Sequence, residues 1–380
     1  MQNPAHKIRK AKIPASLGLL LLALAVRASC LTIPQPTPDE VKLDLELAQN
    51  RKLVAFSSRI NPETISQKVE KEKFFTALKN HQIYNPFFTY ESRPEEIEKV
   101  AEFKPELVGA KSYAQILNRT AKNLSTQAQM LLTNDAKRFA DLSCQLYPAP
   151  ETWLVLEAHR LVRELNLKEE EKNISPNELA EILQKGLEEY RLHNWKIKIA
   201  RNMAARASVS PAARKVKINS TAFFSAKDAR RLILHEIGVH ASRAENGSKR
   251  PLKIFTTGFP GYLATEEGLA VYNEVSNGIT EGLPLFALRV LGVHWALKNS
   301  FHDTFQLLRQ VGADKETAWR ITTRCKRGLK DTSRPGAYTK DASYLRGFYM
   351  IKAARKIDPA IFEKLLKVGK IGVEDLKSFF

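Results

Sequence analysis

The stretch LILHEIGVHASRAENG (residues 232–247) most constrains how this chain can fold, because it places two histidines and a glutamate inside an apolar helical pattern. In a regular α-helix each residue advances by about 100°, so histidines spaced by four lie within about 40° of each other. His240 follows His235 by five residues, which would leave the two side chains about 140° apart, too far for one ion to bridge. A π-bulge, with its i→i+5 hydrogen bonds, would return both histidines to one face, and such bulges occur mostly at functional sites.

The residues around the histidines favour one distorted helix. Ser225 and Asp228 match a capping box at its start, and Asn246-Gly247 is typical of its end. Gly238 lies between the histidines, where it loosens the backbone, although it costs up to about 1 kcal/mol in a regular helix. The sequence therefore predicts a helix with a one-turn π-bulge that brings the two histidines together.

A catalytic zinc ion takes three protein ligands and leaves a fourth position for water, so this helix needs a third ligand from elsewhere. The downstream candidates are Glu266, Glu267, Glu274, His294 and His302. Glu266 and Glu267 lie in the first turn of a second helical pattern, YLATEEGLAVYNEV. Because adjacent helical residues point about 100° apart, only one of the two can be a ligand. The periodicity leaves open which one it is.

Three short segments before the histidine helix alternate apolar with polar residues: WKIKIA (195–200), ARASVS (205–210) and RKVKIN (214–219). Such alternation is typical of half-buried strands, and the PAA between the last two indicates a hairpin. The remaining chain has mostly helical periodicity. We therefore expect an α+β fold, predominantly α, with a small antiparallel sheet beside the HExxxH helix. In such a zincin-like core, an edge strand could hold an extended peptide over the metal.

The N-terminal residues 1–31 differ in kind from the rest. Basic residues precede an apolar run over residues 13–26, and the sequence RASC ends at Cys30, which is the shape of a secretory signal. The run is shorter than the roughly 20 residues that a transmembrane helix needs. We therefore expect export or envelope association, with membrane contact only through this leader. Without export, the protein would be cytoplasmic.

Composition changes divide the remaining chain. A Pro-rich linker, TIPQPTPDE, covers residues 32–40, a helical N-terminal region covers 41–148, and a catalytic region covers 149–380. Within the N-terminal region, YNPFFTY (Tyr84–Tyr90) interrupts the helical periodicity, and we expect it to pack as an ordered aromatic loop.

The charge of the chain narrows its partners only slightly. Sixty Lys and Arg residues against 41 Asp and Glu leave a net charge of +19, which would attract nucleic acid, anionic membranes or acidic polypeptides. No zinc finger, RNA-recognition signature or heptad run accompanies this charge, so nothing indicates specific nucleic-acid binding. Cys30, Cys144 and Cys325 are too few and too scattered for a disulfide framework or a CxxC metal site.

Three motifs, in a fixed order, resemble those of a known family. HEIGVH is followed by EEGLAVYNE and then by RCKRGLKDTSRPGAYTKDASYLRG, with YNPFFTY as a weaker N-terminal match. The chain is similar, from about residue 41 to its C-terminus, to the tyrosine carboxypeptidase family. Its members are the microtubule-associated tyrosine carboxypeptidases and the bacterial QEGLA-motif proteins, which are often labelled flavohemoglobin expression modulators. The segment KRGLKDTSRPGAYTKD is more similar to the microtubule-associated branch.

This resemblance implies an atypical HExxxH zinc metallopeptidase with one catalytic zinc ion. The implied metal ligands are His235, His240 and Glu267, and the implied catalytic glutamate is Glu236. Glu266 falls where the bacterial branch has Gln, so it is the poorer candidate for the third ligand. Val239 stands where both branches usually have Thr, a departure that leaves the implied ligands intact.

The implied chemistry is hydrolysis of a C-terminal peptide bond by zinc-activated water. Glu236 would take the water proton and later pass it to the leaving amine, and Tyr344 could donate a hydrogen bond to the oxyanion. A carboxypeptidase also needs a fixed cation for the terminal carboxylate. The candidates for this substrate-binding role are Arg243, Arg324, Arg327 and Lys340, each of which could instead form a structural contact.

The likeness suggests release of a C-terminal tyrosine from an acidic tail, as on α-tubulin, and a basic surface would speed that encounter. A leader for export agrees with this only if the protein acts outside the cell that makes it. Two alternatives are a zinc endopeptidase, and a non-catalytic regulatory or binding protein on a degenerate metallopeptidase fold. A third, a basic nucleic-acid binder, would lose affinity steeply with salt.

Overall fold

The computed structural model of this chain describes residues 31–105, 107, 113–163, 171–201, 203 and 205–380. The described part is mostly helical with one small sheet, which agrees with the predicted α+β, predominantly α class. The leader predicted for residues 1–31 lies, apart from Leu31, outside the described residues. Among the helices that are described, none combines the length and the apolar composition of a membrane span.

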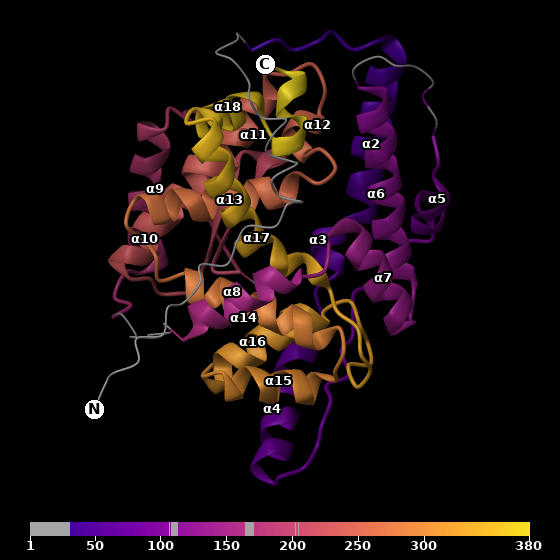
Figure 1. The fold of residues 1–380 in the computed structure, drawn as a ribbon, viewed down its shortest axis with the longest axis vertical. Helices are drawn as coiled ribbons and strands as arrows, with labels where there is room; N and C mark the ends of the chain where they lie inside the picture. The colour runs from indigo at the N-terminus through magenta and orange to yellow at the C-terminus, as the bar shows by residue number, and fades with distance from the viewer. Residues whose placement is uncertain (1–30, 106, 108–112, 164–170, 202, 204) are drawn as a thin grey trace, which may run out of the picture.

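The first helices stand as a column on one side of the molecule (Figure 1). The column begins inside the predicted linker, because Thr37 and Glu40 form a capping box and Pro38 suits the first helical turn. It contains α2 (Pro38–Val54), α3 (Phe56–Arg59), α5 (Glu96–Glu102), α6 (Ala114–Leu132) and α7 (Ala136–Leu146). Between α3 and α5, helix α4 (Thr64–Lys79) leaves the column and packs at one end of the molecule.

The segment Tyr84–Tyr90 contains neither helix nor strand and is anchored by specific contacts, as predicted for an ordered aromatic loop. Phe88 is fully buried, and its backbone N–H donates to the Lys330 carbonyl at 2.9 Å. The Tyr90 hydroxyl donates to the Leu329 carbonyl, also at 2.9 Å. This loop therefore anchors the segment that joins two of the candidate substrate-binding residues, Arg327 and Lys340.

The sheet has three strands in the order β1 (Lys196–Ala200), β3 (Lys215–Asn219) and β2 (Ala207–Ser210). As predicted, β2 and β3 form a hairpin, closed by the 3-10 turn η1 (Pro211–Ala213). However, β1 pairs parallel to β3, so the expected antiparallel arrangement is wrong for this pair. The alternation of side chains fixes the face that each occupies, but it carries no information on strand order.

Helices that precede and follow the strands in the sequence pack against the inner face of the sheet. A capping box at Ser175 begins α9, and the one predicted at Ser225 begins α10. The elements from the end of the column to the middle of the chain are α8 (Thr152–Val162), α9 (Pro176–Glu189), α10 (Ala226–Leu232), the π-helix η2 (Ile233–Ala241), α11 (Ser242–Ser248) and α12 (Ile254–Thr257).

The C-terminal third is helical throughout, with α13 and α17 near the centre of the molecule (Figure 1). Its elements are α13 (Tyr262–Ser276), α14 (Leu283–Ala296), α15 (Phe301–Gln310), α16 (Lys315–Lys326), η3 (Thr339–Ala342), α17 (Ser343–Ile357), α18 (Ile361–Val368) and η4 (Val373–Ser378). A Cβ on Gly268 of α13 would lie 2.3 Å from the carbonyl carbon of Gly347 on α17. The two helices therefore touch backbone to backbone, which fixes the position of α13 residues relative to the start of α17.

Three clusters of buried apolar side chains hold the elements together. One lies under the sheet, a second joins α4 and α8 to α14, α15 and α16, and the third joins the N-terminal column to α13, α17, α18 and η4. In the third cluster, Leu47 and Leu117 of the column share a core with Leu269 of α13 and with Ile371 near the C-terminus. The predicted regions 41–148 and 149–380 thus share a core, and their division stays an expectation from sequence.

Candidate metal centre

The helix that carries the histidines is distorted as its spacing requires. It starts as α10, becomes the π-helix η2 over Ile233–Ala241, and returns to α geometry in α11. The predicted π-bulge is thus confirmed, and it is longer than one turn. The predicted end is displaced by one residue, since α11 ends at Ser248, and Gly247 lies inside it. A Cβ on Gly247 would lie 2.2 Å from the Phe255 carbonyl oxygen, so close packing explains this glycine.

One side chain from α13 and one from α11 support the π segment. The Asn273 amide of α13 donates to the Leu234 carbonyl at 2.9 Å, and the Ser242 hydroxyl donates to the Ile237 carbonyl at 2.9 Å. A Cβ on Gly238 would lie 2.9 Å from the Tyr190 hydroxyl and 3.2 Å from the Asn273 amide. Gly238 therefore also makes room for the partners that stabilise the distorted helix.

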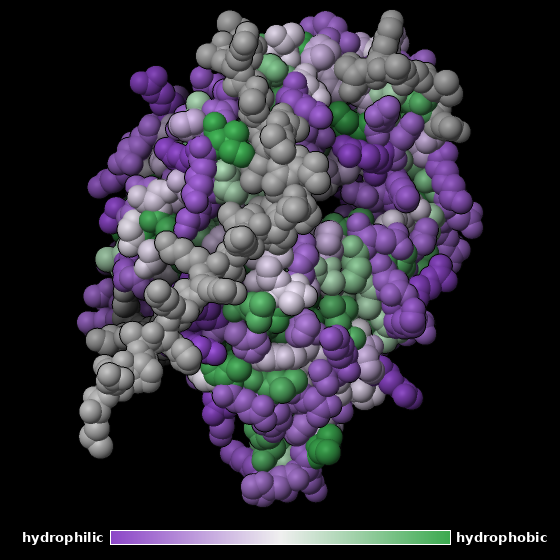
Figure 2. Space-filling model, viewed as in Figure 1, coloured by the Kyte–Doolittle hydropathy of each residue, from purple (hydrophilic) through white to green (hydrophobic). Residues whose placement is uncertain are grey.

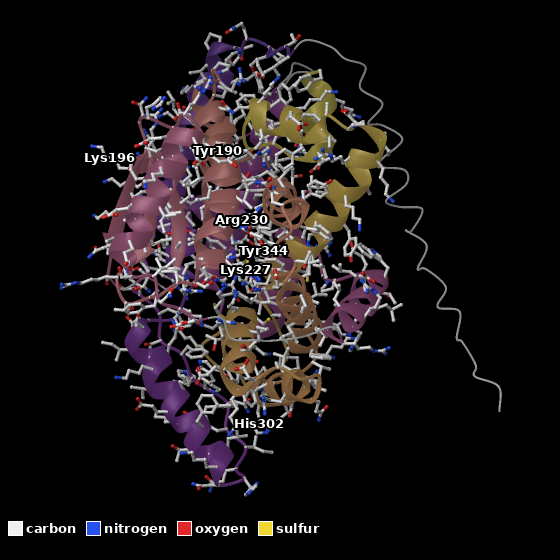
Figure 3. All side chains as sticks on the ribbon, turned by 90° about the vertical axis from the view of Figure 1, so that its left-hand side faces the viewer. Tyr190, Lys196, Lys227, Arg230, His302 and Tyr344 are labelled. Carbon is white, nitrogen blue, oxygen red and sulfur yellow. The ribbon has the colours of Figure 1, made fainter. Side chains whose placement is uncertain are left out.

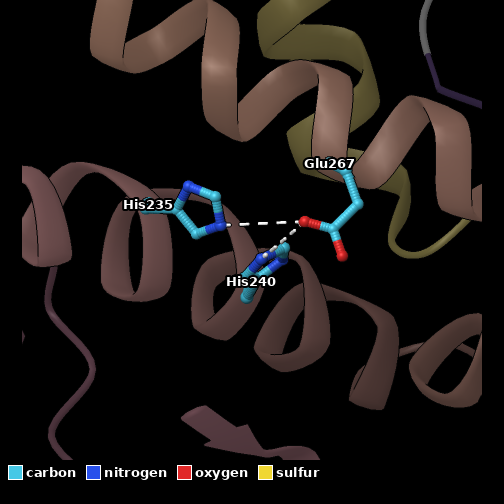
Figure 4. A group of neighbouring side chains, drawn as sticks. All are labelled: His235, His240 and Glu267. Atoms are coloured by element: carbon cyan, nitrogen blue, oxygen red, sulfur yellow. Dashed lines mark ion pairs between the residues drawn. The ribbon is translucent and has the colours of Figure 1, made fainter. Parts of the chain in front are cut away.

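The distortion brings His235, His240 and Glu267 together (Figure 4). The two imidazole rings lie 4.8 Å apart between centroids, and the Nε2 atom of each lies 3.7 Å from the same Glu267 oxygen, Oε2. One ligand atom from each residue lies within 4.8 Å of the other two, so this group could hold a metal ion. Glu267 Oε2 is buried and has no hydrogen-bond partner among the described residues. An orphaned carboxylate oxygen facing two imidazoles fits a bound cation.

Each histidine is oriented from behind by a second glutamate. His235 Nδ1 lies 2.6 Å from Glu274 Oε1, and His240 Nδ1 lies 2.9 Å from Glu266 Oε1. This leaves the Nε2 atoms free to face Glu267. Carboxylates in this position fix the tautomer and orientation of metal-ligating histidines. Glu266 and Glu274, both candidate third ligands from sequence, thus belong to this outer layer, while Glu267 completes the group.

Two buried cations hold Glu266 in turn. Arg243 is fully buried, and its guanidinium forms an ion pair with Glu266 Oε2 and donates to the carbonyls of Gly369 at 3.0 Å and Ile371 at 2.7 Å. Lys370 Nζ lies 2.9 Å from Glu266 Oε1. The structure therefore places Arg243 behind the metal centre, where its donors are occupied, and not on a surface that a substrate could reach. Sequence periodicity missed Lys370 because its segment has no motif.

The charged groups of this cluster shift one another's pKa values. Burial lowers the pKa of His235, but the carboxylates of Glu267 and Glu274 outweigh it and raise that pKa to about 10. Burial raises the pKa of Glu267, but His235, His240 and Lys340 together lower it to about 2. Ionised carboxylates around a shared space thus favour positive charge between them, which a proton or a metal ion can supply.

Comparison with known proteins shows the family of this chain. A family model described as "Microtubule-associated tyrosine carboxypeptidase" matches residues 72–379. The chain belongs to this family. "Microtubule-associated tyrosine carboxypeptidase 1" of Rattus norvegicus is 37% identical over 152 residues, which are 38% of this chain and 32% of the relative.

The human proteins show the same degree of similarity. "Microtubule-associated tyrosine carboxypeptidase 1" of Homo sapiens is 35% identical over 150 residues, or 38% of this chain and 31% of the relative. "Putative tyrosine carboxypeptidase MATCAP2" of Homo sapiens is 34% identical over 149 residues, or 38% of this chain and 28% of the relative. The matched segments span about a third of the length of these curated relatives.

In this member of the tyrosine carboxypeptidase family, Glu236 is half-buried beside His235 and makes no hydrogen bond or ion pair within the described part of the chain. Tyr344 lies at the start of α17, near the centre of the molecule (Figure 3), where its ring stacks on Phe286 at 5.3 Å. Burial raises the pKa of Tyr344, and the Glu267 carboxylate raises it further. Its hydroxyl therefore stays protonated and can donate a hydrogen bond.

The remaining predicted cations divide into two kinds. Arg324 binds Asp341 through two nitrogens, and Arg327 lies 3.5 Å from the same carboxylate while also donating to Asn61 at 3.0 Å. These guanidiniums are anchored in structural pairs. Lys340 is half-buried, makes no hydrogen bond or ion pair among the described residues, and is close enough to Glu267 for the two charges to influence each other's pKa. Lys340 is thus the predicted cation that is best placed for a substrate carboxylate.

One cation near the site was not predicted from the sequence. The Arg289 guanidinium lies 4.8 Å from the Tyr344 ring centroid and 5.1 Å from that of Phe286, and makes no hydrogen bond within the described part of the chain. Apart from a histidine near its C-terminal end, helix α14 (LPLFALRVLGVHWA) has Arg289 as its single ionisable side chain. A single Arg in an otherwise apolar helix was the available signal.

A cavity of about 500 Å³ opens between the N-terminal column and the elements of the C-terminal third. Its walls include α3, α6 and α7 on one side, and the start of α13, η3 and α17 on the other. Figure 2 shows apolar surface gathered along this boundary. The cations Arg51, Arg327, Lys340 and Arg346 line the cavity together with one carboxylate, Glu374. His235, His240 and Glu267 do not line this cavity. Lys340 does, and its charge also lowers the pKa of Glu267.

Proposed function

We propose that this chain is a zinc-dependent carboxypeptidase that removes the C-terminal residue, preferably tyrosine, from an acidic protein tail. The observation that carries the proposal is the convergence of His235, His240 and Glu267 on one point, with an unpaired Glu236 beside them. The names of the curated relatives support tyrosine as the residue released.

The donor set supports zinc as the metal. Two imidazoles and one carboxylate are a known catalytic zinc set, with Zn–N bonds of about 2.0–2.1 Å. Tetrahedral bonds of this length separate two donors by about 3.4 Å, close to the 3.7 Å from each Nε2 to Glu267 Oε2. A zinc ion bound there would polarise the scissile carbonyl and make a water molecule a better nucleophile near neutral pH.

The protein's own groups would move the protons. Glu236 accepts one proton from the attacking water and passes it to the amine that leaves, so that peptide bond and water give one carboxylate and one free amino acid. Tyr344, kept protonated by burial, donates a hydrogen bond to the oxygen that gains negative charge. Glu274 and Glu266 keep the histidines oriented throughout.

Recognition of a free C-terminus requires a cation that is not already satisfied. Lys340 and Arg289 meet this requirement best, because Arg324 and Arg327 are anchored by Asp341 and Arg243 is buried with its donors occupied. The cationic cavity beside Lys340 supports an acidic tail as substrate, and the net charge of +19 would speed its approach.

The names of the relatives point to microtubules, so tubulin is the first substrate to test. The signal-like leader supports export or envelope association, which would place the enzyme outside the cytoplasm of the cell that makes it. We propose that the substrate is then a protein of another compartment or cell. Otherwise the enzyme is cytoplasmic.

Metal analysis and paired peptides test this function. The purified protein should hold about one zinc ion, and Glu267→Ala should lose it. An acidic peptide ending in free tyrosine should be cleaved, while the same peptide with an amidated tyrosine should resist cleavage. Equal cleavage of both peptides would identify an endopeptidase. Bound zinc without cleavage of either peptide would favour a non-catalytic regulatory or binding protein.

A further inference from the structure

The outer face of the sheet carries a compact group of lysines. Lys196 and Lys198 of β1 and Lys215 and Lys217 of β3, which we call the lysine face, alternate with the inward residues of their strands. Figure 3 shows Lys196 pointing away from the body of the molecule. Lys196 and Lys198 are exposed, and Lys215 and Lys217 are partly exposed.

These lysines oppose one another across the strands. Lys196 pairs with Lys215 and Lys198 pairs with Lys217 in the parallel register of β1 and β3. Like charges directly opposite each other destabilise a sheet. No acidic side chain forms an ion pair with any of the four within the described residues. The sheet therefore bears a repulsion that no ion pair among the described residues offsets.

Protection of a sheet edge explains only half of this arrangement. Lysines on an edge strand discourage pairing with other chains, and β1 is an edge strand. However, β3 is the central strand, so Lys215 and Lys217 protect no edge. Ser208 and Ser210 of β2 pair with these two lysines and add hydroxyl groups to the same face. A binding role accounts for charge at the centre of the sheet, where edge protection does not.

The lysine face lies on the side of the sheet away from the metal centre. The inward residues Val216 and Ile218 are fully buried in the cluster that contains Ile237 and Ala241 of the π-helix. The sheet and this apolar layer thus separate the lysine face from the histidines. Whatever binds to the lysine face is not the residue being cleaved.

We propose that the lysine face is an exosite that binds an acidic surface on the folded body of the protein substrate. This proposal rests on the proposed function, because it assigns a second contact to the same substrate. Charge complementarity points to carboxylates. The outward positions of the three strands hold lysine, serine, alanine and asparagine, so they offer no aromatic ring for stacking on nucleic-acid bases and no large apolar side chain for insertion into a membrane.

A charge-matched pair of variants tests the exosite in the full chain. One variant carries Lys196→Gln, Lys198→Gln, Lys215→Gln and Lys217→Gln. The control carries Lys52→Gln, Lys68→Gln, Lys79→Gln and Lys356→Gln, which are exposed helical lysines elsewhere with the same change in net charge. The substrates are intact tubulin, as an acidic folded protein, and a short acidic peptide ending in tyrosine. Thermal unfolding shows whether each variant folds, and removal of the repulsion should leave the lysine-face variant at least as stable as the wild type.

The lysine-face variant should raise KM for tubulin by about tenfold, with kcat and peptide hydrolysis within about twofold of the wild type. The control variant should stay within about twofold of the wild type for both substrates. Equal effects of the two variants, or equal losses for tubulin and for the peptide, would overturn the exosite.

Direct binding separates this proposal from the proposed function. Affinity is measured for tubulin, for phosphatidylserine vesicles and for a single-stranded oligonucleotide, each with both variants. Loss of tubulin affinity in the lysine-face variant alone supports the exosite even if the wild-type protein cleaves neither substrate, in which case only the peptidase function fails. Loss confined to vesicles or to the oligonucleotide assigns the surface to that partner and contradicts an exosite for protein.

Discussion

At the residue scale, the candidate metal centre includes carboxylates that lie behind its histidines. Glu274 lies 2.6 Å from His235 Nδ1 and is 1% exposed. Glu274→Gln keeps the size of the side chain but removes the charge that orients the imidazole, so zinc affinity should fall by about 10-fold to 100-fold. Competition with a chelator measures this. Glu281→Gln, an exposed carboxylate paired with Lys227, is the control and should leave zinc affinity unchanged.

Glu236 differs from these outer carboxylates, because it makes no hydrogen bond or ion pair within the described residues, although it adjoins the candidate ligand His235 in the sequence. Glu236→Gln removes the proposed proton acceptor, so kcat/KM for an acidic tyrosine-ending peptide should fall by at least about 10²-fold to 10⁴-fold. Zinc content should stay near that of the wild type. If zinc is lost together with activity, Glu236 belongs to the metal-binding group and the proposed mechanism is wrong.

The residue-level predictions from sequence succeed where a helical pattern limits the choices. The two histidines had to share a face for any metal site, and they do. Periodicity could not choose between Glu266 and Glu267, because both sit on one helical turn, and the structure uses both in different roles. Arg243 was one of four candidates for the substrate carboxylate, but it donates to carbonyls of a segment more than a hundred residues away. Contacts with such distant backbone groups cannot be predicted from a local sequence pattern.

At the scale of elements, the contact of α13 with α17 determines whether Glu267 reaches the histidines. Gly268→Ala would put a methyl group 2.3 Å from the Gly347 backbone, so the helices must separate. We expect a loss of about 1–3 kcal/mol in unfolding free energy, as for other overpacked sites, and weaker zinc binding because the adjacent Glu267 moves. Urea unfolding and chelator competition measure the two effects.

The control for that variant is a glycine whose substitution strains only its own backbone. Gly278 follows α13, has a φ of +82° and has nothing within 4 Å of an added Cβ. Gly278→Ala should cost about 1–2 kcal/mol without changing zinc affinity. Equal zinc affinity in both glycine variants would show that the α13–α17 contact does not position Glu267.

A buried ion cluster joins α16 to η3, and it predicts a dependence of stability on pH. Burial raises the pKa of Asp341, but Arg324 and Arg327 hold it well below its ordinary value. A carboxyl group with a depressed pKa in the folded state stabilises the fold above the unfolded pKa of about 3.9, and this is lost as pH falls through the folded pKa. Asp341→Asn should therefore cost about 3 kcal/mol near pH 7.

The difference in unfolding free energy between Asp341→Asn and the wild type should shrink as pH falls below about 4. Urea unfolding between pH 2 and pH 7 measures it. A constant difference over that range would mean that the charge of Asp341 contributes nothing and that only its hydrogen bonds matter.

Elements were predicted best where the local sequence carries caps. The capping box at Ser225 begins a helix where expected, and the hairpin of β2 and β3 follows its turn. The parallel pairing of β1 with β3 was missed because strand order depends on how the chain crosses the sheet. The π-helix was inferred from the spacing of the two histidines and not from helix propensity. That spacing could not predict that the π-helix extends over nine residues.

At the scale of the whole molecule, the N-terminal column is part of the same folded body as the metal centre. Leu117 of α6 and Leu269 of α13 lie in one cluster, and Leu269 is two residues from Glu267. The sequence suggested a boundary at residue 148 from a change of local composition, and such a change can mark a linker or only a turn. Only the packing of distant residues tells the two apart.

This shared core predicts one cooperative unfolding unit. Backbone amides in the middle of α6 and of α13 should exchange with solvent only through global unfolding, so hydrogen exchange should give both the same opening free energy. Urea should lower both values with the same slope, since the same surface is exposed in each case. If α6 amides open at a lower free energy with a smaller slope, the column unfolds by itself. The cavity between column and catalytic elements would then open without loss of the metal centre, and the substrate tail would enter a site that the N-terminal helices can leave.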